Sequence, residues 1–190
     1  MRITPIHIQK TQTRSRFNIR REYFLIILGS LLLLSWSIHR YYYVRSLSLP
    51  DNLVTSGNTT KTISPIFIDI QGMPRLPIVE GGKINGVWTI SHKAANHVQT
   101  SAVPGSAGNS IIYGHNTDAI FGKLITIPIG TVITITTSDG NHHRYKISET
   151  YEVDPWQTEL LQNAVTEVLT IYTCSGWFDS KRYVVRAVPI

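Results

Sequence analysis

The longest apolar stretch in the chain runs from Tyr23 to Ile38 and contains no charged residue. A bilayer core about 30 Å thick needs roughly 20 helical residues to cross it, and about 17 are tolerated. Aromatic residues at both edges suit the membrane interfaces, and the flanking arginines can extend their charged ends outward. The pattern predicts one transmembrane helix over residues 23–43. A buried helix or a cleaved signal peptide is the alternative, but a long segment precedes the run and no small-residue cleavage site follows it.

Basic residues are distributed unevenly on the two sides of this run. Six of them lie within residues 1–22, whereas only Arg40 and Arg45 follow closely. By the positive-inside rule, we expect residues 1–22 to stay in the cytoplasm and the chain after residue 43 to lie outside. Residues 44–62 are polar and rich in turn formers, which predicts a tether. The sequence therefore predicts a single-pass membrane protein with an extracytoplasmic domain.

Residues 63–190 consist of short apolar runs separated by Gly, Pro, Asn and Asp. Val, Ile, Thr and Tyr dominate these runs, which is typical of half-buried strands. Only residues 155–167 and 117–127 look helical, and both stretches are brief. Seven or eight short strands in about 130 residues favour a mostly antiparallel barrel or sandwich, and the pattern does not choose between them. The clearest strand candidates are 65–70, 86–91, 109–115, 131–137, 143–153, 167–174 and 182–188.

The formal net charge of +6 comes entirely from the N-terminal part of the chain. Residues 1–59 hold eight basic residues against Glu22 and Asp51, whereas residues 60–190 hold ten residues of each sign. A neutral domain lacks the basic surface that binds nucleic-acid phosphates. We therefore expect no nucleic-acid partner.

Cys174 is the only cysteine, so it cannot form an intrachain disulfide. A lone cysteine on a strand is more often a small buried apolar residue than a reagent. Here, however, the thiol ends its strand, and Ser175-Gly176 follows at once. A strand that begins at Arg182 could pair back and place a guanidinium near the sulfur. A nearby cation favours the thiolate, which is the nucleophilic form.

A catalytic thiol usually needs an imidazole with which to exchange a proton. Three histidines are candidates from their positions alone: His92 and His97 in an irregular stretch, and His115 at the end of an apolar strand. The local pattern does not choose among them. No spacing typical of zinc, calcium or phosphate sites is present, so we expect neither a metal nor a cofactor.

Several stretches resemble the sortase family. "TIYTC" at 170–174 is similar to the T-L-x-T-C signature of sortases, and "KRYVVRA" at 181–187 is similar to the arginine strand that follows it. "PGSAGNSIIYGHN" at 104–116 resembles the histidine-bearing segment, and "LPIVEGGKINGVWTIS" at 76–91 resembles the strands before it. The resemblance runs from about Ile66 to Val188, and a class D- or E-like group fits it best. Ile171 stands where the signature usually has leucine, which is a volume-conserving change.

This resemblance implies a mostly β domain over residues 63–190, a closed eight-stranded β-barrel of the sortase type with short helices. It also implies a catalytic triad of His115, Cys174 and Arg182, with Thr173 contacting the substrate. The thiol would attack an LPxTG-like sorting motif near the C-terminus of an exported protein. An amine, such as a cell-wall peptide or a pilin lysine, would then resolve the thioacyl-enzyme and attach the protein to the cell surface.

Two other functions remain open at this stage. A membrane-anchored cysteine peptidase would use the same thiol with water as the acceptor. A non-catalytic β-domain would bind wall polymer or a partner protein, and Cys174 would then be dispensable.

Overall fold

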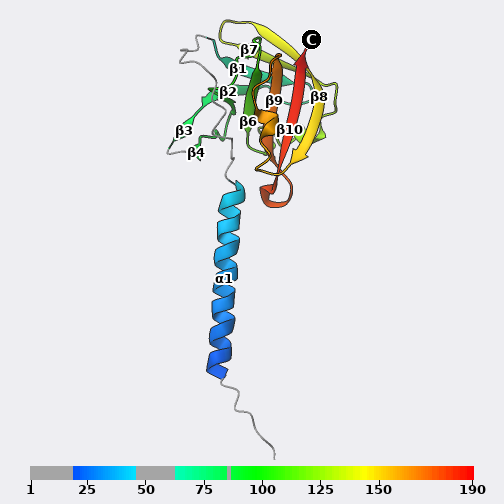
Figure 1. Cartoon of the computed structure of the whole chain (residues 1–190). Helices are drawn as coiled ribbons and strands as arrows, with labels where there is room; N and C mark the ends of the chain where they lie inside the picture. The colour runs from blue at the N-terminus through cyan, green and yellow to red at the C-terminus, as the bar shows by residue number, and fades with distance from the viewer. Residues whose placement is uncertain (1–18, 46–62, 85–86) are drawn as a thin grey trace, which may run out of the picture. The chain divides into compact units, whose positions relative to one another are not determined.

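The computed structural model describes residues 19–45, 63–84 and 87–190 (Figure 1). The chain divides into two units, Met1–Arg40 and Tyr41–Ile190. Helix α1 (Ile19–Arg45) includes a stretch from Tyr23 to Arg40 that is long and apolar enough to cross a membrane, and none of that stretch is buried. Most of the predicted cytoplasmic segment and nearly all of the predicted tether lie outside the described residues.

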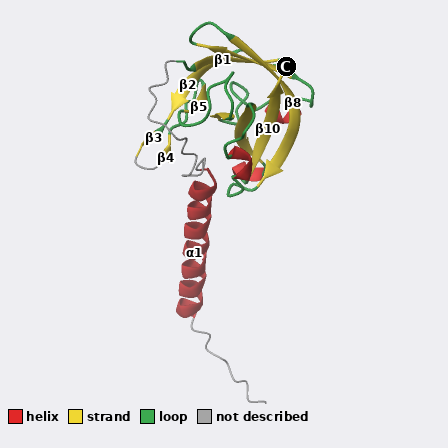
Figure 2. Ribbon diagram, turned by 45° about the horizontal axis from the view of Figure 1, so that its top comes forward, coloured by secondary structure: helices red, strands yellow, loops and turns green. Residues whose placement is uncertain are grey.

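The second unit contains eight strands that close into a barrel, with a separate two-stranded sheet beside them (Figures 1 and 2). The predicted eight-stranded closed barrel is therefore confirmed. The barrel strands, in their order around the wall, are β1 (Pro65–Ile70), β2 (Leu76–Gly81), β5 (Ala95–Val98), β6 (Asn109–Gly114), β9 (Val168–Ser175), β10 (Lys181–Pro189), β8 (His142–Val153) and β7 (Val132–Thr137). The small sheet pairs β3 (Lys83–Ile84) with β4 (Val87–Trp88).

Two of the barrel pairings are parallel, β2 with β5 and β6 with β9, and the other barrel pairings are antiparallel. Parallel neighbours need a long crossover connection, and β7 and β8 lie within the connection between β6 and β9. The pairing of β6 with β9 brings two segments that are distant in sequence to the same end of the barrel. This is the arrangement that positions the candidate site.

Strand β9 is buried on both faces, because an apolar cluster packs on each side of the barrel wall. Leu169 and Ile171 belong to the larger cluster, whereas Tyr172 belongs to the smaller one. Successive side chains of a strand point to opposite faces, so the larger cluster fills the barrel and the smaller one lies outside its wall. We call the smaller one the outer cluster; its buried members are Val98, Ile111, Tyr113, Leu161, Tyr172 and Val184.

The two stretches predicted to be helical form only single 3₁₀ turns, η1 (Leu124–Thr126) and η2 (Glu159–Leu161). The side chain of Asn109 explains the shortness of η2. Its Nδ2 donates to the carbonyls of Leu160 and Gln162, at 3.2 and 3.0 Å. An α-helix would use these carbonyls for its own next turn, so the contact with β6 replaces the helix.

Candidate active site

Three neighbouring strands bring the predicted triad to one end of the barrel wall. Strands β9 and β10 pair with Cys174 opposite Arg182. Strands β6 and β9 pair in parallel up to Gly114 and Thr173. His115 follows Gly114 directly, so it leaves β6 at the level of Cys174. The register therefore sets the three residues in one row across the strand ends.

The three residues also share one face of the wall. Each of the three residues lies two positions along the chain from a member of the outer cluster. Side chains two residues apart on a strand point to the same face. The members concerned are Tyr113, Tyr172 and Val184. The row therefore continues the outer cluster, on the outside of the barrel, where a peptide can approach.

Close packing after β6 holds the backbone of His115. A Cβ on Gly114 would lie 2.8 Å from Cγ2 of Ile120 and 2.9 Å from Cδ2 of Phe121, which is too close for any residue but glycine. The N–H of Phe121 donates to the carbonyl of His115 at 3.1 Å. The loop after β6 thus folds back tightly on the strand end and fixes where the imidazole begins.

Cys174 is buried but not sealed, since 7% of its surface is exposed. It belongs to neither apolar cluster among the described residues. Gly176 follows with φ of 74°, a left-handed conformation that suits glycine, and it turns the chain out of the sheet. The side chains of Trp177 and Phe178 then stand exposed with their rings edge to face, 5.2 Å between centroids. An exposed aromatic pair therefore follows Cys174 closely along the chain.

The guanidinium of Arg182 is completely buried. Its Nη1 donates to the carbonyls of Asp179 and Lys181, at 2.7 and 2.9 Å. Asp179 has φ of 59°, a left-handed conformation that is uncommon for residues other than glycine. This conformation belongs to the short turn η3 (Trp177–Asp179), whose carbonyl at residue 179 is aimed at the guanidinium. A buried charge is costly unless it is hydrogen-bonded, so this loop stabilises the cation beside the thiol.

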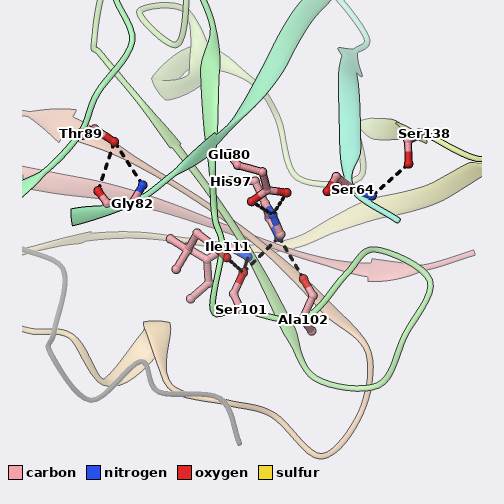
Figure 3. A network of polar contacts seen from close by, with 10 residues as sticks. Ser64, Glu80, Gly82, Thr89, His97, Ser101, Ala102, Ile111 and Ser138 are labelled. Carbon is pink, nitrogen blue, oxygen red and sulfur yellow. Dashed lines mark hydrogen bonds and ion pairs between the residues drawn. The ribbon is translucent and has the colours of Figure 1, made fainter. Parts of the chain in front are cut away.

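His97 is unsuited to acid–base work because both of its ring nitrogens belong to a buried network (Figure 3). Its Nδ1 faces both carboxylate oxygens of Glu80, at 3.1 and 3.0 Å. Its Nε2 lies 3.0 Å from the carbonyl of Ala102 and 3.2 Å from Oγ of Ser101. The Ser101 hydroxyl donates to the carbonyl of Val98, so it accepts from Nε2, which therefore carries a proton. His97 thus ties β2 and β5 to the loop after β5.

The other two histidines lie together. The rings of His92 and His115 are stacked, with 4.7 Å between centroids and 10° between planes. His115 is half-buried and His92 is exposed. Of the three histidines that the sequence left open, His115 is the one whose backbone the register sets beside Cys174, and His92 reaches it only through the loop before β5.

Thr173 lies on the opposite face of β9 from Cys174. Its side chain is completely buried, and its hydroxyl donates to the carbonyl of Gly114 at 2.9 Å. This bond joins the ends of β6 and β9. The substrate contact expected of Thr173 stays a prediction, and it would have to use the main chain, because the hydroxyl is already engaged.

Two buried tyrosines, Tyr113 and Tyr172, face each other across β6 and β9. Burial is the main cause that raises the pKa of each phenol to about 12, so both are protonated donors at neutral pH. The positive charge of Arg182 opposes the effect of burial on the pKa of Tyr172. The Tyr113 hydroxyl donates to the carbonyl of Thr89 at 2.6 Å.

Removing either hydroxyl should therefore have different effects on stability. We expect Tyr113→Phe to lower the free energy of unfolding by about 1–2 kcal/mol, because the Thr89 carbonyl loses its donor. Tyr172→Phe should change it by no more than about 0.5 kcal/mol, because that hydroxyl makes no good hydrogen bond within the described residues. Urea unfolding followed by tryptophan fluorescence measures both values. Equal losses in the two variants would contradict the contrast.

Within residues 19–45, 63–84 and 87–190, no group of three or more His, Cys, Asp or Glu side chains could hold a metal ion. The expected lack of a cofactor is not tested by this observation and stays a prediction.

Sequence reasoning missed the contribution of the backbone carbonyls at Asp179 and Lys181. No signal could have revealed it, because any residue has a carbonyl and nothing in "SGWFDSK" requires Phe178 and Asp179 to adopt positive φ. The hydrogen bonds of Asn109 take the place of the expected helix. Asn109 lies in the "PGSAGN" stretch that resembles sortases, but the carbonyls it binds are more than fifty residues away, so the local sequence could not reveal them.

A family model described as the sortase domain matches residues 68–190. No match was found among curated protein sequences.

Solved structures of sortases resemble the chain. A sortase D transpeptidase from Clostridium perfringens is 28% identical, with a TM-score of 0.57, over 67% of this chain and 79% of that one. A lid mutant of sortase A from Corynebacterium diphtheriae is also 28% identical, with a TM-score of 0.54, over 66% of this chain and 70% of that one. Sortase C from Streptococcus agalactiae, 20% identical with a TM-score of 0.57 over 65% of this chain and 67% of that one, indicates the shared fold alone.

Proposed function

Because this chain belongs to the sortase family, we propose that it is a cysteine transpeptidase, held in a membrane by α1 and acting on exported proteins. It cleaves an LPxTG-like sorting motif near the C-terminus of such a protein and transfers the acyl part to an amine. The acceptor is an amine at the cell surface, such as a cell-wall peptide or a pilin lysine. Charge placement favours residues 1–22 in the cytoplasm and the barrel outside.

One observation carries the assignment of the site. Cys174 and Arg182 are a cross-strand pair, and His115 leaves the neighbouring strand one residue past its last pairing with β9. The pairing supports a nucleophile flanked by a cation on one side and an imidazole on the other. The guanidinium next to the thiol favours the thiolate. A half-buried imidazole is suited to exchange protons with both the thiol and the amine.

In the first half of the reaction, the Cys174 thiolate attacks the carbonyl carbon of the scissile peptide bond. The tetrahedral intermediate carries its negative charge on the former carbonyl oxygen, which Arg182 stabilises. The carbon–nitrogen bond then breaks, and protonated His115 gives its proton to the departing amine. A thioester between Cys174 and the substrate remains.

In the second half, an incoming amine attacks the thioester carbon and His115 removes one of its protons. The carbon–sulfur bond breaks, and the new amide leaves. The sulfur returns as thiolate beside protonated His115, so the enzyme is regenerated. Water in place of the amine would give hydrolysis, which is the peptidase alternative.

Mass spectrometry distinguishes these acceptors directly. The full-length protein in detergent micelles is incubated with a library of LPxTG-like peptides, with or without triglycine as the amine. When triglycine is present, we expect the acyl fragment to appear as its triglycine amide, heavier than the free acid by triglycine minus one water. A product that remains the free acid at saturating triglycine would identify a peptidase. A library that yields neither a product nor a thioester on Cys174 would leave only the non-catalytic alternative.

A further inference from the structure

The stacked imidazole of His92 is the feature near Cys174 to which the proposed reaction gives no role. Its ring lies parallel to that of His115 with 4.7 Å between centroids. An exposed side chain thus covers one face of a half-buried imidazole.

The turn that carries His92 is held by its own hydrogen bonds. The Ser91 hydroxyl accepts from the N–H groups of Lys93 and Ala94, at 3.2 and 3.1 Å. The N–H of Ser91 donates to Oδ1 of Asn96 at 2.8 Å, and Asn96 is a buried residue of β5. His92 therefore stands at the tip of a tight turn that is fastened to the barrel wall.

A second attachment joins this loop to the strand of His115 itself. The Tyr113 hydroxyl, two residues before His115, donates to the carbonyl of Thr89 at 2.6 Å. The Thr89 hydroxyl donates to the carbonyl of Gly82 and accepts from its N–H, both at 3.1 Å (Figure 3). The N–H of Thr89 donates to the same carbonyl at 2.8 Å. The loop is thus bound to β6 through Thr89 and to β5 through Ser91, both shortly before His92. Both rings of the stack are held by the same part of the wall.

This construction has a direct consequence for proton transfer. An imidazole at the end of a strand can turn about two side-chain bonds, and only one orientation directs a nitrogen at the neighbouring thiol. A flat ring packed on one face restricts that turning.

We propose that His92 is a positioning residue, whose ring holds the His115 imidazole in the orientation that exchanges protons with Cys174 and the amines. The inference rests on the proposed function, since it assigns His92 a role in that same site. It concerns the flat ring and not a second acid, so an aromatic side chain without nitrogen should replace it. His92 itself makes no bond to the reacting atoms.

Two substitutions at His92 separate this role from a structural one. In full-length protein, we expect His92→Ala to lower kcat about tenfold with KM nearly unchanged, because substrate binding does not involve the stack. His92→Phe should keep at least half of the wild-type kcat. Lys93→Ala changes the next exposed side chain in the same turn and should leave both constants unchanged. Thermal unfolding should differ little among the variants, because both side chains are exposed.

A second measurement needs no peptide. The rate at which iodoacetamide alkylates Cys174 reports how well the imidazole supports the thiolate. We expect this rate at neutral pH to fall several-fold in His92→Ala and to recover in His92→Phe. Full activity in His92→Ala would overturn the inference, and so would an equal loss in His92→Phe. A wild-type protein that forms no transpeptidation product would instead contradict the proposed function, and alkylation would still decide the role of the stack.

Discussion

Cys174→Ala is expected to lower transpeptidation by at least about 10⁴-fold, because removal of a nucleophile eliminates the covalent route and the chain has no second thiol to replace it. The sulfur lies in neither apolar cluster, so its loss should leave the barrel folded. Product mass spectrometry measures the activity, and circular dichroism with thermal unfolding measures the fold. Intact-mass spectra of the wild type should also show a thioester that the variant lacks.

Two matched variants make this result specific. Cys174→Ser keeps nearly the same size and should be almost as inactive, because a hydroxyl at this position is a much weaker nucleophile at neutral pH. His142→Ala removes an exposed imidazole from β8 and should retain wild-type activity. Substantial turnover by a well-folded Cys174→Ala protein would rule out the thioacyl mechanism.

The second large effect is expected for Arg182→Lys, in spite of the retained positive charge. The guanidinium presents several donors in a rigid fork, and one of its nitrogens already contacts the carbonyls of Asp179 and Lys181. A lysine ammonium cannot hold both carbonyls and also reach a developing oxyanion. Loss of one such donor typically lowers the rate by about 10²–10³-fold. We expect a decrease of this size in kcat/KM, together with some loss of stability because buried carbonyls lose their donors.

Arg186→Lys is the control on the same strand. Arg186 is half-buried and lies four residues after Arg182 on β10. Its Nη1 is 3.9 Å from Oε2 of Glu149. A long, partly exposed ion pair contributes little, so this variant should keep both its kcat/KM and its stability. Steady-state kinetics on the two variants would refute the role of the guanidinium if Arg182→Lys matched Arg186→Lys.

The strands were predictable because each carries a local signal. In runs such as 132–137 and 168–175, β-branched and aromatic residues either alternate with polar ones or follow one another without a break, and both patterns are typical of strands. Asp139-Gly140 marks the turn between β7 and β8. Closure of the barrel was not predictable from these runs, since it depends on the pairing of β1 with β7, and no local pattern encodes that contact. The closed barrel was predicted only from the resemblance to sortases, because the periodicity of the runs did not distinguish a barrel from a sandwich.

The placement of the candidate site residues was predictable to a similar degree, whereas their catalytic role stays a prediction. The cysteine at a strand end and the arginine eight residues later indicated a pair, and β9 and β10 do pair them. The residues alone left three imidazoles open, and the resemblance to sortases named His115. Only tertiary contacts, the bonds from His97 to Glu80 and Ala102, reveal that the His97 ring is engaged elsewhere. The same holds for the left-handed backbone at Asp179, which nothing in its sequence neighbourhood signals.

The parallel pairing of β6 with β9 has a consequence for folding kinetics. Gly114 and Thr173, which join the two strand ends, are 59 residues apart along the chain. Contacts this distant form late, because the entropy of closing the intervening loop is lost before the contact stabilises anything. A nascent or partly unfolded chain therefore carries its thiol without the neighbouring imidazole, so under the proposed mechanism it would be inactive until the wall is complete.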